Sequence, residues 1–436
     1  MKLTTLLILA LASLISSCLL PSEVNPNLAA NTWVPPAPRT HIPIGTGDRF
    51  ANGTLAPVGL GVHDRNLKSI LTPTEIDSGL RALANLFPKD VTLFQPPYTT
   101  YENAHLHGAS VGANPRVFIM SGIHARERGG PDDVLYFLAD LLQARLARTG
   151  IKYGDAVYTR QQVVTALNVG IVVLPLVNPD GVAYDQQTDS CWRKNRNPAS
   201  SVLDPGVDLN RNFDFLWNYT EAFSSQADLS AAASDDPASE VFHGEAPMSE
   251  PEVKNVEWVL DSFPNLTWFL DLHSFGGEIL YAWGDDNLQT QNKTQNFLNS
   301  GFDGKRGITG VDPPGLHYRE YMLAVDAAAQ HAVGIRMKNA MALAGSTPYS
   351  VEESVSLYPT SGTSTDWVQA RWYGRECGAT KIHGLTLEFG EGSYATTCPF
   401  YPDHAEYHQW MREVSVGLME LMLNAAEGGD PVVWEC

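Results

Sequence analysis

The sequence predicts an α/β protein built on one open, mixed and mainly parallel β-sheet with helices on both faces. Two observations predict this class. Four short apolar runs recur along the chain, as strands buried on both faces require, and helical patterns separate them. No repeat of about 20 to 50 residues is present, which excludes solenoids and propellers. The 436 residues, 44% of them hydrophobic, also suffice to bury a large core.

The predicted elements follow one another in a regular order. A helix is expected over residues 74–86, where Thr74 and Glu75 suit a helix start and Pro88 marks the end. Residues 117–120 form the first buried strand, and an amphipathic helix follows. The apolar face of that helix contains Val134, Leu135, Leu138, Leu141 and Leu142. The other predicted strands span residues 169–174, 266–272 and 384–389.

The first 55 residues are interpreted as two segments that precede the main domain. Residues 1–18 combine Lys2, an apolar run and small residues before Cys18, which is typical of a signal peptide and predicts secretion. The same residues resemble a bacterial lipoprotein box, so a lipid anchor on Cys18 is the alternative. Residues 19–55 are interpreted as a leader rich in Pro and Gly, and residues 56–436 as a single domain.

Composition excludes several classes of partner. The chain carries 29 basic and 49 acidic residues, a net charge of −20, and has no local basic patch, so it is not expected to bind nucleic acid. No apolar run after the signal peptide is long enough to span a membrane. Four cysteines remain after cleavage, and two disulfides in any of three pairings are possible. These cysteines are Cys191, Cys377, Cys398 and Cys436.

Candidate metal ligands follow the predicted strands. In an open α/β sheet, the active site lies beyond the carboxyl ends of the strands. His124 and Glu127 come directly after the first strand, with a spacing that lets both reach one ion from a single turn. His273 ends the third strand, 149 residues after His124, and is the candidate third ligand. An imidazole and a carboxylate suit Zn²⁺, which needs three protein ligands and an open position for catalysis.

A second pair with the same spacing, His317 and Glu320, is interpreted differently. It follows the Pro- and Gly-containing residues 312–315 and opens a helical pattern over residues 321–341. Glu320 is therefore expected to be an ordinary acid in the first turn of that helix.

Further motifs make the chain resemble the carboxypeptidase A-like family of zinc metallopeptidases, from about residue 56 to residue 425. Those found in the family's order are His124-Ala125-Arg126-Glu127, Asn178-Pro179-Asp180-Gly181, Trp192-Arg193-Lys194, Asn210-Arg211-Asn212, His273-Ser274, Leu357-Tyr358 and Leu387-Glu388. The resemblance implies one Zn²⁺ ion held by His124, Glu127 and His273. Residues 178–181 are interpreted as a structural turn.

The catalytic roles are assigned to two residues. Glu388 lies on the fourth strand, where its apolar neighbours alternate to the other face, and it is the expected base. Glu391 is its local rival, and the resemblance favours Glu388. Arg193 is expected to stabilise the oxyanion, since that task favours a permanently charged donor.

The remaining residues are expected to bind substrate. Asn210 and Arg211 supply an amide and a planar fork that match a terminal carboxylate. The resemblance implies that Arg126 helps to bind substrate and that Tyr358 closes over it. It also places Thr365 at the base of the side-chain pocket. Because Thr365 is uncharged, and Gly284 and Thr386 are expected nearby, the pocket should favour apolar or aromatic C-terminal residues.

The sequence therefore predicts a secreted, monomeric zinc metallocarboxypeptidase that acts on peptides with a free C-terminus. Two alternatives stay open. One is a zinc hydrolase of the same fold that cleaves cell-wall peptides or small amides, and the other is a secreted binding module without catalysis. The leader of 37 residues is too short to be the inhibitory pro-domain of pancreatic-type relatives, so the protein is either secreted active or masked by the leader itself. The 115 residues between His273 and Glu388 exceed the usual interval in the family.

Overall fold

The computed structural model describes Leu20 and residues 39–200, 205–315, 317–393 and 395–436. The predicted signal peptide, Cys18 and most of residues 19–38 lie outside the described residues. The described end of the leader packs on the body, where Ile42 and Phe50 are buried in an apolar core. No helix of the described residues is long and apolar enough to cross a membrane.

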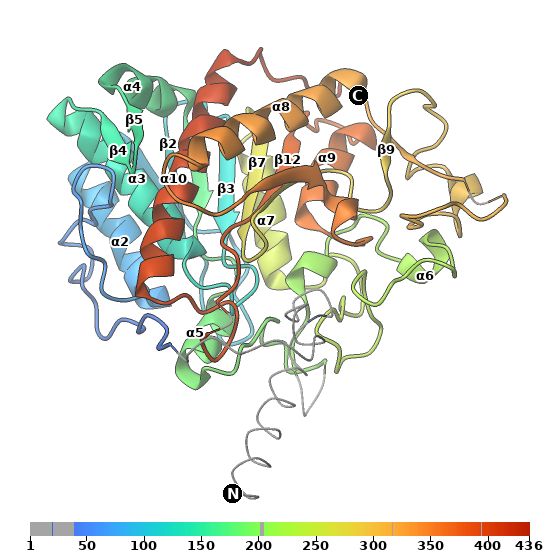
Figure 1. Cartoon of the computed structure of the whole chain (residues 1–436), viewed down its shortest axis with the longest axis horizontal. Helices are drawn as coiled ribbons and strands as arrows, with labels where there is room; N and C mark the ends of the chain where they lie inside the picture. The colour runs from blue at the N-terminus through green and yellow to red at the C-terminus, as the bar shows by residue number, and fades with distance from the viewer. Residues whose placement is uncertain (1–19, 21–38, 201–204, 316, 394) are drawn as a thin grey trace, which may run out of the picture.

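An eight-stranded mixed sheet forms the centre of the molecule (Figure 1). Its strands lie in the order β1 (Val91–Phe94), β2 (Gly108–Val111), β6 (Ile171–Leu174), β3 (Val117–Ser121), β7 (Trp268–His273), β12 (His383–Glu388), β8 (Glu278–Tyr281) and β11 (Ser350–Glu353). The strands β6, β3, β7 and β12 are mutually parallel, and β2 and β8 flank them antiparallel. The predicted fold class is confirmed.

Helices cover both faces of this sheet. The longer ones are α2 (Pro73–Leu86), α3 (Gly130–Ala147), α4 (Arg160–Val169), α5 (Pro179–Thr188), α7 (Pro251–Ser262), α8 (Ala324–Met341), α9 (Ser364–Tyr373) and α10 (His404–Glu427). Short elements complete the fold: α6 (Tyr219–Ala222), the pair β4 (Ile151–Tyr153) and β5 (Ala156–Tyr158), and the pair β9 (Leu288–Gln289) and β10 (Glu320–Tyr321). In Figure 1, α8 and α10 lie on the viewer's side of the central strands.

Strand β3 contributes side chains to two apolar cores, one on each face of the sheet. Successive side chains of a strand point to opposite faces, and all residues of β3 are buried. Val117 and Ile119 join the core beneath α2, α3, α8 and α10, whereas Phe118 and Met120 join the core beneath α7 and α9. A strand that must be apolar on both faces therefore reads as a continuous apolar run.

The boundaries of several predicted elements differ from expectation. Helix α2 is capped by Thr72, whose hydroxyl accepts from the Glu75 amide at 3.2 Å, so the helix starts earlier than Thr74 suggests. The prediction of a structural turn over residues 178–181 was wrong. Asn178 caps α5 there, accepting from the amide of Gly181 at 2.9 Å.

The prediction for Glu320 was also wrong. It lies in β10 rather than in the first turn of α8, and it is fully buried, accepting a hydrogen bond of 2.6 Å from the Tyr318 hydroxyl. Burial raises the pKa of Glu320 to about 7. The side chain of His317 is 69% exposed and bonds to Asp312. His317 is thus mostly exposed to solvent, whereas Glu320 is fully buried.

Candidate metal centre and substrate pocket

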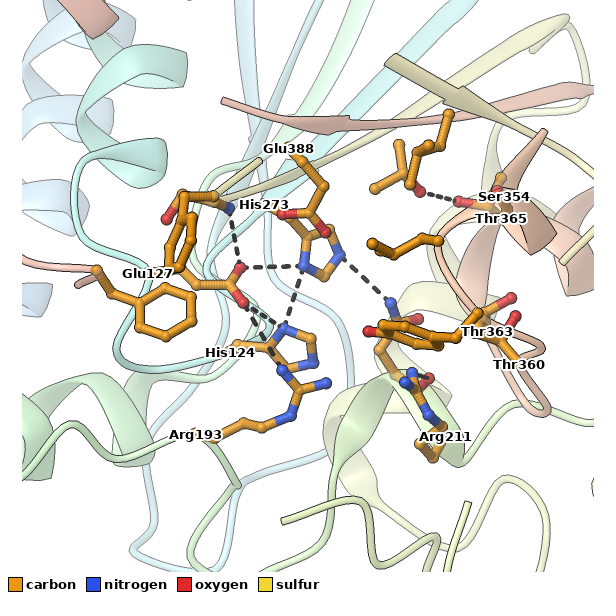
Figure 2. A pocket seen from close by; sticks show the side chains of 18 residues that line it. His124, Glu127, Arg193, Arg211, His273, Ser354, Thr360, Thr363, Thr365 and Glu388 are labelled. Carbon is orange, nitrogen blue, oxygen red and sulfur yellow. Dashed lines mark hydrogen bonds and ion pairs between the residues drawn. The ribbon is translucent and has the colours of Figure 1, made fainter. Parts of the chain in front are cut away.

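Three side chains converge at the carboxyl edge of the sheet, where β3 and β7 run parallel and adjacent (Figure 2). Gly122 leaves β3 with a φ of +64°, and His124 and Glu127 lie in the turn that follows. The Nδ1 atom of His124 lies 2.6 Å from Glu127 Oε1, and the Nδ1 atom of His273 lies 3.0 Å from Glu127 Oε2. The candidate ligand atoms of all three residues lie within 4.8 Å of one another, and the residues are buried.

Two carboxylates orient the histidines from behind. Asp208 Oδ1 lies 3.0 Å from Nε2 of His124, and Asp271 Oδ2 lies 3.0 Å from Nε2 of His273. A carboxylate on the outer nitrogen turns the inner nitrogen toward the metal and increases its basicity. Two Nδ1 atoms oriented in this way, together with the Glu127 carboxylate, fit the donor set of a catalytic zinc.

Sequence reasoning missed both carboxylates as partners of the histidines. Asp271 carried a usable signal, because it lies two residues before His273 on the same face of β7. Asp208 carried none, since 84 residues separate it from His124.

Arg193 and Glu388 face the centre from two other segments. Arg193 donates from Nε and Nη2 to Asp208 Oδ2 at 3.0 and 2.8 Å, so the carboxylate that orients His124 also fixes this guanidinium. Burial alone would raise the pKa of Asp208, but Arg193 and His124 outweigh it and hold the pKa well below its ordinary value.

Glu388 ends β12 beside His273, with which it is in register, and lines the pocket. Its neighbours Leu385 and Leu387 are fully buried in the core, as the alternation predicts. Burial raises the pKa of Glu388 well above its ordinary value. Glu391 is exposed and does not line this pocket.

Asn210 and Arg211 lie on the opposite wall of the pocket, in a single helical turn (Leu209–Arg211). Asn210 is held by the amide of Ser364, which donates to its Oδ1 at 2.8 Å. Arg211 donates from Nη2 to Ala231 O at 2.9 Å, and its Cζ lies 5.9 Å from the centre of the Tyr358 ring. Figure 2 shows Arg211 across the pocket from the metal ligands.

The rest of the pocket wall is uncharged. Its hydroxyl side chains are Ser274, Ser354, Thr360, Thr363, Thr365 and Thr386, its aliphatic ones are Leu280 and Leu357, and Phe275 and Phe400 add two aromatic rings. The hydroxyls of Thr365 and Thr386 lie 2.7 Å apart. A Cβ atom at Gly284 would lie 2.2 Å from Thr360 Oγ1 and 2.8 Å from Asp366 Oδ2, so only glycine fits against these side chains without a shift.

Arg126 is the one predicted substrate-binding residue that the structure does not bring to the pocket wall. Its side chain is fully buried, with Cζ 4.4 Å from the centre of the Phe400 ring and Nη1 3.6 Å from Glu240 Oε2. The other predicted residues all line one cavity: His124, Glu127, Arg193, Asn210, Arg211, His273, Tyr358, Thr365 and Glu388.

A zinc site of two histidines and one glutamate at the edge of a mixed α/β sheet is typical of a zinc-dependent peptidase. The chain belongs to the zinc carboxypeptidase family, because the model of that family matches residues 76–394. The predicted resemblance and the predicted zinc cofactor are confirmed.

Similar proteins agree with this membership. The chain is 32% identical over 216 residues to a carboxypeptidase B from Astacus astacus, an alignment that covers 48% of this chain and 63% of that protein. It is 30% identical over 233 residues to the inactive metallocarboxypeptidase ECM14 from Uncinocarpus reesii, which covers 49% of this chain and 35% of that protein. Bovine thrombin-activatable fibrinolysis inhibitor, solved in complex with tick carboxypeptidase inhibitor, shares the fold with a TM-score of 0.59 at 20% identity, over 82% of this chain and 98% of that one.

Proposed function

We propose that the protein is a secreted zinc metallocarboxypeptidase that hydrolyses the last peptide bond of substrates with a free C-terminal carboxylate. The observation that carries this proposal is the convergence of a base, two arginines and a zinc donor set on one cavity. A carboxylate anchor opposite a metal centre suits the removal of a terminal residue rather than cleavage inside a chain.

Zinc, when bound by His124, Glu127 and His273, supplies a Lewis acid that activates water and polarises the scissile carbonyl. Glu388 accepts the proton of the attacking water and returns it to the leaving amine. Arg193 donates hydrogen bonds to the oxyanion that forms at the carbonyl carbon, and Asp208 holds it in place for this purpose.

The terminal carboxylate of the substrate is assigned to Arg211 and Asn210. The planar guanidinium of Arg211 offers two parallel donors, which match the two oxygens of a carboxylate. Tyr358 lies beside this anchor, where its ring can cover the bound residue. Arg126 lies off the pocket wall and is fully buried, so no substrate contact is assigned to it.

The pocket supports a preference for neutral C-terminal residues, apolar or aromatic. Its floor holds Thr365 and Thr386, whose hydroxyls satisfy each other, and the aliphatic Leu280 and Leu357 line its sides. A charged side chain would find no opposite charge on this part of the wall. This is the physical basis of the preference.

One alternative is a binding module that has lost catalysis, and the relative described as inactive gives it a concrete precedent. The filled base, oxyanion and ligand positions of this chain favour an active enzyme. The other alternative is hydrolysis of cell-wall peptides or small amides. Tyr358 and the anchor of Asn210 and Arg211 favour ordinary peptides, although cell-wall peptides also end in carboxylates. Secretion is supported by the predicted signal peptide and by two disulfides, Cys191–Cys398 and Cys377–Cys436.

A mass-spectrometric digest tests the proposal. Zinc-loaded protein is incubated with peptides that differ only in the last residue (Phe, Leu, Ala, Lys or Glu), each as the free acid and as the amide. Loss of one residue from the free acids alone, fastest for Phe or Leu, supports the activity, the anchor and the neutral pocket. Removal of zinc by a chelator should abolish cleavage, and added zinc should restore it. Absence of cleavage in every peptide would contradict the proposal.

A further inference from the structure

A buried hydrogen-bond network has its hub at Asp185 on α5 and includes Arg128, the chain neighbour of the metal ligand Glu127. The Asp185 carboxylate accepts from Arg128 Nε at 3.0 Å, from the Tyr401 hydroxyl at 2.5 Å and from the Trp192 amide at 2.9 Å. Asp185 and Tyr401 are fully buried, and Arg128 nearly so. The Cζ atom of Arg128 lies 3.4 Å from the centre of the Tyr401 ring, so these groups form one packed unit.

Each donor in this network is the chain neighbour of a residue that faces the pocket. Arg128 follows the metal ligand Glu127, and Trp192 precedes Arg193. Tyr401 follows Phe400, which lines the pocket and packs against Phe275 with ring centres 4.9 Å apart.

The Cys191–Cys398 disulfide joins two of the same three segments. Cys191 lies two residues before Arg193, and Cys398 lies two residues before Phe400. The Cys191 amide also donates to the Tyr401 hydroxyl at 2.7 Å, so the covalent link and the network meet at one residue. Both cysteines are buried in a small apolar cluster with Phe400 and Tyr401.

The backbone at Cys191 needs such support. Its φ is +60°, a conformation that side-chain-bearing residues rarely adopt and that persists only where surrounding contacts hold it. Asp208 fixes the guanidinium of Arg193, but it does not fix the backbone from which that side chain extends. The contacts of Cys191 and Trp192 do so, together with the hydrogen bond of 3.0 Å that the Ala125 amide donates to Arg193 O.

We propose that Asp185, Tyr401 and the Cys191–Cys398 disulfide form a positioning unit. This unit holds Arg193 and Phe400 at fixed positions relative to the metal ligands. These residues do not touch the substrate and act through their neighbours. The inference rests on the proposed function for its catalytic consequence, although the structural coupling can be measured without substrate.

The test compares two buried tyrosine hydroxyls. Tyr401→Phe removes the bonds to Asp185 and Cys191 and keeps the ring over Arg128. Tyr153→Phe is the matched control, because the Tyr153 hydroxyl donates to the buried Asp140 at 2.9 Å, Tyr153 is 1% exposed, and β4 contributes nothing to the pocket wall. Tyr401→Phe should lower kcat by about tenfold or more with little change in KM, whereas Tyr153→Phe should lower only the Tm.

Hydrogen exchange read by mass spectrometry provides the measurement that needs no activity. Exchange in residues 189–197 and 389–402 should rise in Tyr401→Phe and stay at the wild-type level in Tyr153→Phe. If the wild-type protein cleaves no peptide yet these segments loosen, the proposed function fails and the positioning unit stands. If exchange in these segments and kcat both match the wild type, the positioning unit is wrong.

A second pair of variants examines the disulfide. The double variant Cys191→Ala/Cys398→Ala should lose kcat, while Cys377→Ala/Cys436→Ala, which removes the disulfide near the C-terminus, should lose thermal stability alone. Zinc content and zinc affinity are measured for all variants, so that a loss of metal is separated from a displaced Arg193. An equal kcat in the two double variants would contradict a positioning role for the first disulfide.

Discussion

At the scale of single residues, the role proposed for Glu388 depends on its place at the end of β12, beside His273 and facing the pocket. Glu388→Gln keeps the size of the side chain but removes the proton acceptor. We expect kcat to fall by about 10²- to 10⁴-fold while zinc stoichiometry and peptide binding are retained. Stopped assays measure kcat, and metal analysis measures the zinc stoichiometry. Glu391→Gln, at an exposed position outside the pocket, is the control. Near-wild-type turnover in Glu388→Gln would show that another residue is the base.

Arg211 allows a separate prediction about recognition. Arg211→Lys keeps a positive charge but loses the fork that matches two carboxylate oxygens. Because one charge-assisted hydrogen bond contributes about 1.5–3 kcal/mol, kcat/KM for free-acid peptides should fall by about 10- to 100-fold, mainly through KM. The preference for free acids over amides should shrink by a similar factor. A preference that stays at the wild-type level would show that another group binds the terminus.

The sequence predicted most of the residues that the site brings together, and the reason is their place in the chain. His124, His273 and Glu388 follow or end buried strands, and the active site of an open α/β sheet lies at these strand ends. Asp208 and Asp185 could not be predicted as orienting groups, because their partners lie far away in sequence and no local pattern connects them.

At the scale of elements, strands β3, β6, β7 and β12 were predictable because they read as apolar runs. Strand β2 is fully buried too, but it was not predictable, because its sequence Gly108–Val111 consists mostly of small residues and forms no such run. Strands β1, β8 and β11 were not, since they are short and partly exposed and their patterns are mixed. The predicted start of α2 was misplaced because the sequence offers two residues that could cap it. Both Thr72 and Thr74 suit a cap, and the reciprocal bonds of Thr72 and Glu75 decide between them.

Helix α10 offers a prediction about stability. Its cap, Asp403, accepts from the amides of Ala405 and Glu406 at 2.8 and 3.0 Å and pairs with Arg39. Asp403→Ala should lower the free energy of unfolding by about 1–2 kcal/mol at pH 7, measured by denaturant titration. Asp403→Asn is the control, because it keeps an acceptor for the helix amides and should lose less.

The pH dependence of this loss has a defined sign. Burial alone would raise the pKa of Asp403, but the bonds from Glu406 and Arg39 outweigh it, and the pKa lies below its ordinary value. The stabilisation is therefore complete above the unfolded pKa of about 4 and is lost as the pH falls through the lower folded pKa. The difference between wild type and Asp403→Ala should narrow at pH 3. A constant difference would show that the charge of Asp403 plays no part.

At the scale of the whole molecule, a net charge of −20 accompanies several acids buried in the interior. Burial raises the pKa of Asp132 and of Asp366 to about 7. It raises the pKa of Glu252 to about 8, with a further contribution from the neighbouring Glu250. These groups hold a proton in the folded state at pH values where the unfolded chain has released it.

Such acids make the folded protein more stable in weak acid than at alkaline pH. Between the ordinary pKa near 4.3 and the raised value of about 8, folded Glu252 binds more protons than unfolded Glu252, so its contribution to stability falls as the pH rises through this window. Glu252→Gln imitates the protonated side chain and removes this dependence. The difference in Tm between Glu252→Gln and wild type, both zinc-loaded, should move in favour of the variant between pH 5 and pH 8. Glu435→Gln, at an exposed position, should show no such trend. A difference that is independent of pH for Glu252→Gln would mean that this carboxyl is already ionised in the folded protein.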